Sequence, residues 1–153
     1  MLCISSSNFL FYSVFLFNEK IGLWYGGKET NNKIKKSLLE KTSKLNVGPY
    51  TDEKTDFGPL SSEAHYKKVL GYIDSGEKEG AKLLSDGRNF KKQGYENGYF
   101  VGPTIFDEVK PEMKIYKEEI FGPVLSMMTT EKYEDALKLV NDHELGNGAA
   151  VFT

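Results

Sequence analysis

Helical and strand patterns alternate along most of this chain, and that alternation limits the possible folds more than any other feature. From Lys28 onward, amphipathic stretches are separated by short runs rich in β-branched and aromatic residues. Chains with this alternation form α/β domains, in which helices cover the faces of a mainly parallel sheet. We therefore expect an α/β fold with a largely parallel sheet flanked by helices.

Local signals place the individual elements. Helices are predicted over 30–45, from a cap at Ser61 or Ser62 to the glycines at 76 and 80, and over 133–143. Strands are predicted over 81–84, 99–101, 103–106, 124–128 and 149–152, with at most a helical turn within 111–119. The lysine-rich side of the first helix is expected to face solvent.

Composition excludes several classes of protein. The 153 residues include 20 Lys+Arg and 22 Asp+Glu, a net charge of -2, which excludes a basic nucleic-acid binder. The single cysteine, Cys3, excludes a disulfide framework and a thiolate zinc site. His65 and His143 are too few and lie too far apart in sequence to form a metal site without cysteines. We expect His65 to be solvated or capping and His143 to complement a helix C-terminus.

The N-terminal segment differs from the rest of the chain. Residues 1–18 carry no charge, and Phe9 to Phe17 form a dense apolar run. As a signal peptide the run lacks a basic n-region, and as a membrane span it is shorter than the roughly 20 residues that a bilayer core needs. Its aromatic content also suits a buried strand, and a segment outside the fold remains a further interpretation.

One segment has the character of a binding site. Glu118 and Glu119 stand just before Phe121, and Gly122-Pro123 then fixes the backbone at the start of a predicted strand. These side chains are therefore expected at an end of the sheet, where open α/β sheets bind ligands. A carboxylate there can accept hydrogen bonds from sugar hydroxyls, and a phenyl ring can pack against a flat heterocycle. A plain strand entry with exposed acids is the simpler interpretation.

Four ordered motifs carry a family resemblance, which covers roughly residues 28–153. They are Asp56-Phe57-Gly58-Pro59-Leu60, Gly98-Tyr99-Phe100-Val101-Gly102-Pro103-Thr104-Ile105, Glu119-Ile120-Phe121-Gly122-Pro123-Val124 and Gly146-Asn147-Gly148-Ala149-Ala150-Val151-Phe152-Thr153. The chain resembles part of the catalytic domain of the aldehyde dehydrogenase superfamily. Details such as Tyr95-Glu96-Asn97-Gly98 are most similar to the CoA-acylating methylmalonate-semialdehyde dehydrogenases of valine catabolism.

The resemblance implies a cofactor and two residues that contact it. In the family, the glutamate matching Glu119 holds the nicotinamide ribose hydroxyls of NAD, and the phenylalanine matching Phe121 borders the nicotinamide ring. The family oxidises an aldehyde through a cysteine thioester and passes the acyl group to CoA. The resemblance further implies a homo-oligomer, while the net charge excludes a nucleic-acid partner and a membrane partner is not expected. The compartment would be mitochondrial in a eukaryote and cytoplasmic otherwise.

The chain also departs from the family pattern. Family members are about three times as long, and their dinucleotide-binding half has no counterpart here. By the family's spacing the nucleophilic cysteine would fall near Glu19, so the role is not transferred to Cys3. We expect residues 1–27 to be a non-family apolar segment and residues 28–153 to be a partial catalytic domain. The isolated chain is expected to be inactive, with a non-catalytic protein that pairs with full-length subunits, or a small membrane-anchored protein, as alternatives.

Overall fold

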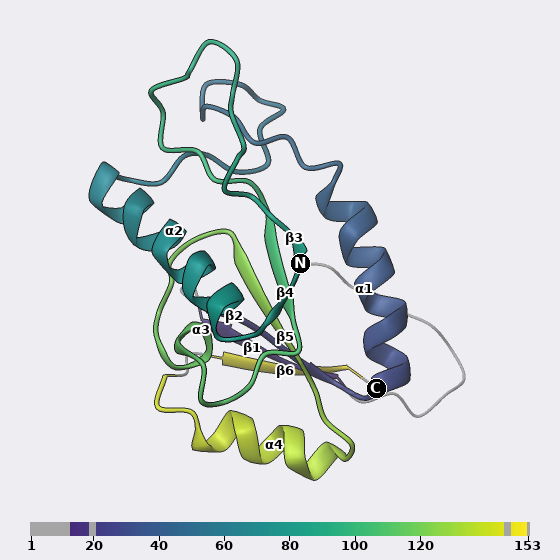
Figure 1. Cartoon of the computed structure of the whole chain (residues 1–153). Coiled ribbons are helices and arrows are strands. Elements are labelled where there is room, and N and C mark those ends of the chain that lie inside the picture. The colour runs from purple at the N-terminus through teal and green to yellow at the C-terminus, as the bar shows by residue number, and fades with distance from the viewer. Residues whose placement is uncertain (1–12, 19–20, 146–147, 153) are drawn as a thin grey trace.

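The computed structural model describes residues 13–18, 21–145 and 148–152, which form one mixed sheet with helices on both sides (Figure 1). The strands are β1 (Ser13–Asn18), β2 (Ile21–Gly26), β3 (Lys82–Ser85), β4 (Thr104–Asp107), β5 (Val124–Thr129) and β6 (Gly148–Phe152). The helices are α1 (Lys28–Thr42), α2 (Glu63–Lys78), α3 (Lys114–Lys117) and α4 (Tyr133–Asp142). The predicted α/β class is confirmed.

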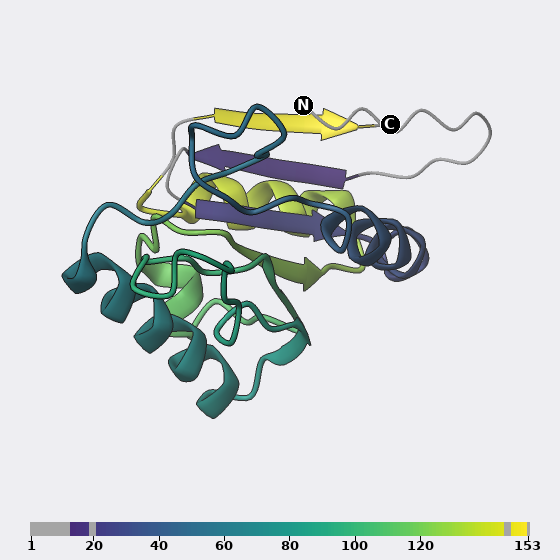
Figure 2. The ribbon, with the colours of Figure 1, turned by 90° about the horizontal axis from the view of Figure 1, so that it is seen from above.

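The sheet is mixed, so the expected parallel arrangement holds only at its centre. The strand order is β3-β4-β5-β2-β1-β6, and Figure 2 shows β5, β2, β1 and β6 following one another. The pairs β4–β5 and β5–β2 are parallel, whereas β3–β4, β2–β1 and β1–β6 are antiparallel. Because β1 ends at Asn18 and β2 begins at Ile21, the connection is too short for parallel neighbours. The prediction of a largely parallel sheet was therefore wrong.

The N-terminal apolar run lies partly within this sheet. Residues 13–18 form β1, which pairs with both β2 and β6, while residues 1–12 lie outside the described part of the chain. No helix in the described ranges is both long enough and apolar enough to cross a bilayer. The division of the chain at residues 27 and 28 stays a prediction.

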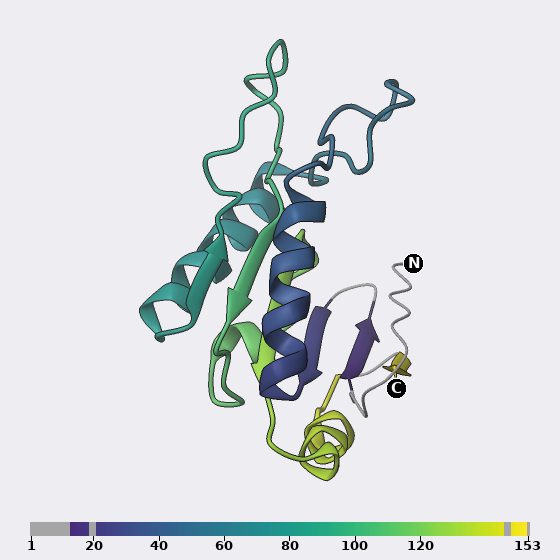
Figure 3. The ribbon, with the colours of Figure 1, turned by 90° about the vertical axis from the view of Figure 1, so that its right-hand side faces the viewer.

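Helices α1 and α2 lie on opposite sides of the central strands (Figure 3). The main core lies between the sheet and α2, α3 and α4, where Phe106 and Val124 meet Ile73 and Ile115. All four residues of β4 are buried, as expected of a central strand covered on both faces. The large buried core thus fixes α2 against the sheet.

Helix α1 is attached by polar contacts that its sequence pattern does not reveal. The fully buried Asn31 donates hydrogen bonds to the Met128 carbonyl (2.9 Å) and to Thr129 Oγ1 (2.8 Å). Lys35 forms an ion pair with the buried Asp107 at the end of β4. The predicted solvated face is otherwise confirmed, since the other lysines of α1 are exposed.

The strand expected over residues 99–101 is absent from the described sheet. The backbone here and at the adjacent Gly102 makes single bonds to two loops: Leu60 N–H donates to Tyr99 O (2.9 Å), and Gly102 N–H donates to Gly87 O (2.9 Å). These backbone groups therefore join loops together instead of extending a ladder. Aromatic and β-branched content alone could not distinguish these two outcomes.

Candidate functional site

The segment Glu118–Val124 links α3 to β5 in a fixed backbone conformation. Phe121 adopts a positive φ of 56°, which is unusual for a residue with a side chain. On either side of it the chain is anchored, because Ile120 is buried and the Pro123 carbonyl accepts a hydrogen bond from Thr104 N–H (2.8 Å). Such a conformation persists only where its surroundings determine it strongly. The result is a Phe121 side chain that is 43% exposed beside a half-buried Glu119.

The position of this segment corrects one step of the sequence argument. The segment lies at an end of the sheet, as predicted. However, it immediately precedes β5, whose first residue Val124 pairs in parallel with Thr104, the first residue of β4. It therefore lies at the amino ends of these parallel strands, whereas the general rule for open α/β sheets concerns the carboxyl ends. The rule gives no support to a ligand site here.

One face of α2 supports the segment at three points. Three α2 residues, His65, Val69 and Tyr72, are spaced four and three positions apart, so they share one face of the helix. Tyr72 Oη donates a hydrogen bond to Glu118 Oε2 (2.8 Å). At Gly122 a Cβ atom would lie 3.0 Å from both methyl carbons of the buried Val69. Glycine thus permits the close approach of the loop to α2.

The third support is His65. Its ring contacts that of Phe121 edge to face, with centroids 6.4 Å apart and an interplanar angle of 78°. Its Nδ1 lies 3.3 Å from Ser61 Oγ, and Ser62 caps the helix by accepting a hydrogen bond from His65 N–H. The Nε2 atom is buried and has no hydrogen-bond partner in the part of the chain that the structure describes. The imidazole is therefore not the cap, because Ser62 provides it, and the residue is half-buried and only partly open to solvent.

The two adjacent carboxylates have different surroundings. Glu118 accepts the hydrogen bond from Tyr72, whose ring also lies 5.5 Å from Lys68 Nζ and 5.3 Å from Lys114 Nζ. Burial, followed by the contact with Glu118, raises the pKa of Tyr72 to about 12. Glu118 therefore helps to hold the loop, whereas Glu119 lies beside Phe121 in the predicted binding pair.

Sequence reasoning selected Glu119 and Phe121 but missed the residues that support them. The helix itself was predicted, but the face that carries the buried Val69 and Tyr72 was not linked to this segment. Helical spacing was the available signal, because Tyr72 follows Val69 by three positions. Nothing in the local sequence indicated that this face meets the segment before β5.

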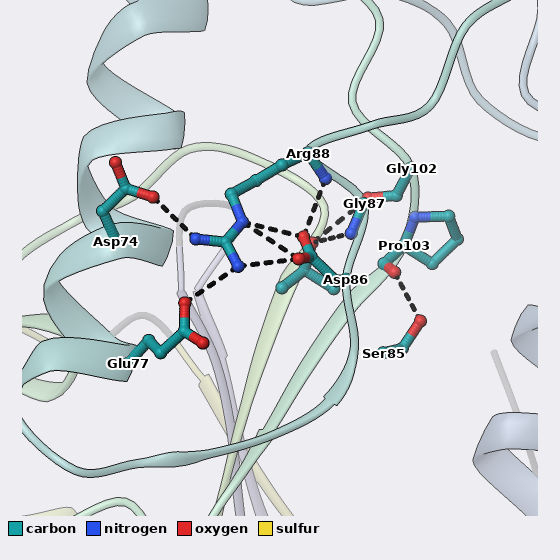
Figure 4. A network of polar contacts seen from close by, with 9 residues as sticks. Asp74, Glu77, Ser85, Asp86, Gly87, Arg88, Gly102 and Pro103 are labelled. Carbon is teal, nitrogen blue, oxygen red and sulfur yellow. Dashed lines mark hydrogen bonds and ion pairs between the residues drawn. The ribbon is translucent and has the colours of Figure 1, made fainter.

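The sole arginine forms a separate ionic cluster (Figure 4). Arg88 pairs with Asp74 (2.7 Å) and Glu77 (2.9 Å) of α2 and with Asp86 (2.7 Å) in its own turn. The hydrogen bonds that the guanidinium donates, first to Asp86 and then to Asp74, raise the pKa of Arg88 above its usual value. With three carboxylates around it, the guanidinium connects the turn after β3 to α2, which is a structural role.

The described residues offer no alternative centre of metal chemistry. No group of three or more His, Cys, Asp or Glu side chains among them is placed to hold a metal ion. At the end of α4, His143 Nε2 donates to the Tyr116 carbonyl (2.8 Å), and Leu145 N–H donates to His143 Nδ1 (3.0 Å). Both ring nitrogens of His143 are thus used in local structure. Cys3 lies outside the described residues.

Comparison with known proteins agrees with the sequence resemblance. The family model "Aldehyde dehydrogenase family" matches residues 25–153. The malonate-semialdehyde dehydrogenase of Pseudomonas aeruginosa is 46% identical over 83% of this chain and 26% of its own length. The mitochondrial, acylating methylmalonate-semialdehyde/malonate-semialdehyde dehydrogenase of Bos taurus is 52% identical over 76% of this chain and 22% of its own length. The chain therefore spans about a quarter of these relatives.

A solved structure extends the similarity to the fold. It is a Sinorhizobium meliloti protein assigned as a candidate methylmalonate-semialdehyde dehydrogenase, in complex with NAD. The two chains are 51% identical with a TM-score of 0.78, over 79% of this chain and 25% of the other. The α/β arrangement described above thus aligns with part of a dehydrogenase that was solved with NAD.

Proposed function

Since this chain belongs to the aldehyde dehydrogenase family, we propose that it supplies the nicotinamide end of the NAD site in a (methyl)malonate-semialdehyde dehydrogenase. The observation that supports this most is the presentation of Phe121, 43% exposed on a strained backbone, beside a half-buried Glu119. In this proposal 28–153 is part of the catalytic domain.

These two side chains suit the nicotinamide riboside part of NAD. An exposed phenyl ring can pack against a flat heterocycle, and a carboxylate can accept hydrogen bonds from adjacent ribose hydroxyls. When bound, NAD accepts the hydride that the aldehyde loses. Phe121 would border the nicotinamide ring, and Glu119 would hold its ribose. The contribution of this chain would be to bind and orient the cofactor.

The remaining chemistry is proposed from the relatives. The intact enzyme would oxidise methylmalonate or malonate semialdehyde through a cysteine thioester and transfer the acyl group to CoA. It would act as a homo-oligomer in valine catabolism, and in a eukaryote it would be mitochondrial, as the name of the Bos taurus relative states for that protein. We assign no nucleophile within these 153 residues, because the only cysteine is Cys3. The isolated chain should therefore form no NADH from a semialdehyde and CoA.

Saturation-transfer NMR with nicotinamide mononucleotide tests the proposal on the chain itself. Saturating the protein should transfer magnetisation to the nicotinamide protons, and AMP at the same concentration should receive little. Phe121→Ala should abolish the transfer to the ring, and Glu119→Gln should weaken it. Glu118→Gln is the matched control, because a glutamine there still accepts the hydrogen bond from Tyr72. Equal transfer in the wild type and in Phe121→Ala would refute the assignment.

A further inference from the structure

The buried Nε2 of His65 is the part of the α2 support that local structure does not explain. The N-terminus of α2 is capped by Ser62, so the imidazole is not needed there. Its Nε2 is buried and makes no hydrogen bond to any described residue. Burying a polar atom without a partner costs free energy. The ring is held by the contact of its Nδ1 with Ser61 Oγ (3.3 Å) and by packing, and its aromatic neighbour among the described residues is Phe121.

The geometry of that contact suits an orienting role. The two rings meet at 78° with centroids 6.4 Å apart, within the range preferred for edge-to-face aromatic pairs. His65 is fixed in turn, because it belongs to the first turn of a 16-residue helix packed on the core. Phe121, by contrast, belongs to a loop and has an exposed ring. The contact therefore joins the exposed ring of a loop residue to a residue of a helix that packs on the core.

The backbone of Phe121 strengthens this argument. A phenylalanine at φ 56° needs anchors on both sides, and the structure provides Ile120 in the core and Gly122 against Val69. Those anchors act on the backbone, whereas the edge-to-face contact with His65 acts on the Phe121 ring itself. The imidazole of His65 lies where it can limit rotation of that ring.

We propose that His65 is a positioning residue that holds the Phe121 ring in the orientation used to border nicotinamide. The inference rests on the proposed function, since it concerns the same site. His65 would touch neither the aldehyde nor the reacting atoms. Its effect would pass through Phe121, so its loss should loosen the phenyl ring and weaken binding of the nicotinamide end.

The experiment uses the full chain with the variants His65→Ala, His65→Leu and His65→Phe. Three-bond couplings measured on labelled phenylalanine report the χ1 rotamer of Phe121, and a titration reports the dissociation constant of nicotinamide mononucleotide. In His65→Ala and His65→Leu we expect rotamer averaging and a dissociation constant about 2- to 13-fold higher, the range given by an aromatic pair worth about 0.5–1.5 kcal/mol. His65→Phe restores an aromatic edge and should restore the single rotamer.

The outcomes separate this inference from the proposed function. A single Phe121 rotamer in folded His65→Leu, which fills most of the same volume, would overturn the inference even if the mononucleotide still binds. Failure of the wild-type chain to bind the mononucleotide would contradict the proposed function, while the rotamer measurement would still decide the role of His65. If His65→Ala fails to fold, comparison of His65→Leu with His65→Phe gives the same decision.

Discussion

The close approach of Gly122 to Val69 gives the sharpest test of how α2 supports the candidate site. In Gly122→Ala the new methyl group would lie 3.0 Å from both methyl carbons of Val69, which is fully buried and cannot move freely. Overpacking of this kind costs about 1–3 kcal/mol. Val69→Ala removes two buried methyl groups, worth about 1.6 kcal/mol by transfer, and leaves a cavity that adds to the loss.

The double variant should be much more stable than the sum of the two losses. With Val69→Ala the space beside Gly122 opens, so the alanine methyl at 122 fills part of the cavity instead of clashing. We expect a coupling free energy of about 1–3 kcal/mol, within the range for residues in contact. The measurement is equilibrium unfolding in urea, followed by circular dichroism, for the wild type, both single variants and the double variant.

Gly71→Ala provides the control for this cycle. Gly71 lies on the same helix as Val69, but a Cβ atom there would meet nothing within 4 Å. Combined with Gly122→Ala, it should give additive free energies of unfolding. Additive losses in the Gly122→Ala and Val69→Ala double variant would refute the packing argument, and with it the view that α2 shapes this loop.

Three further predictions concern the surroundings of α2. Gly76→Ala should be about 1–3 kcal/mol less stable than Gly71→Ala in urea unfolding, because its methyl group would lie 2.8 Å from Ile115 Cδ1. Both variants gain the same helix propensity, so equal stabilities would contradict this prediction. The raised pKa of Tyr72, about 12 against 10.0, means that its contribution to stability is complete below pH 10 and is lost as the pH rises to 12. Between pH 9 and 12 the free energy of unfolding of Tyr72→Phe should therefore fall less than that of the wild type. If the two free energies fall in parallel with pH, this role of Tyr72 is refuted. Arg88→Lys should lower the free energy of unfolding by about 1 kcal/mol at low salt and by less at high salt, because one ammonium group cannot pair with three partly exposed carboxylates at once. A loss of stability that does not depend on salt would contradict the ionic explanation.

Local patterns were sufficient to predict most elements of this fold. The capping serine at 62, the apolar spacing of α2 and the short β-rich runs each depend on neighbouring residues, and the structure confirms the elements they predict except the strand over 99–101. The segment at 99–101 shows where such reasoning ends. Whether an extended stretch joins a sheet depends on which backbone groups lie opposite, and Tyr99 and Gly102 bond to loops from other parts of the sequence.

The candidate site was likewise predictable only where neighbouring residues determine it. The residue types before Gly122-Pro123 indicated this segment, and the family resemblance then selected Glu119 and Phe121 within it. Their supports could not be predicted, because a helical period identifies which α2 residues share a face but not which distant loop that face will meet. His65 illustrates this well, since its aromatic partner lies on a segment far along the chain. The mixed sheet could not be predicted for the same reason, because β1 forms antiparallel pairs on both of its edges.

The most direct test of the account is an amide NMR titration of the ¹⁵N-labelled chain with nicotinamide mononucleotide. We predict that the largest shift changes occur at Glu119 and Phe121 and extend to the first turns of α2, with AMP causing much smaller changes there. The same titration of Phe121→Ala should lose most of these changes. Shift changes centred on the Arg88 turn or on the lysines of α1, or equal responses to both nucleotides, would contradict the assignment of this segment to the nicotinamide end of NAD.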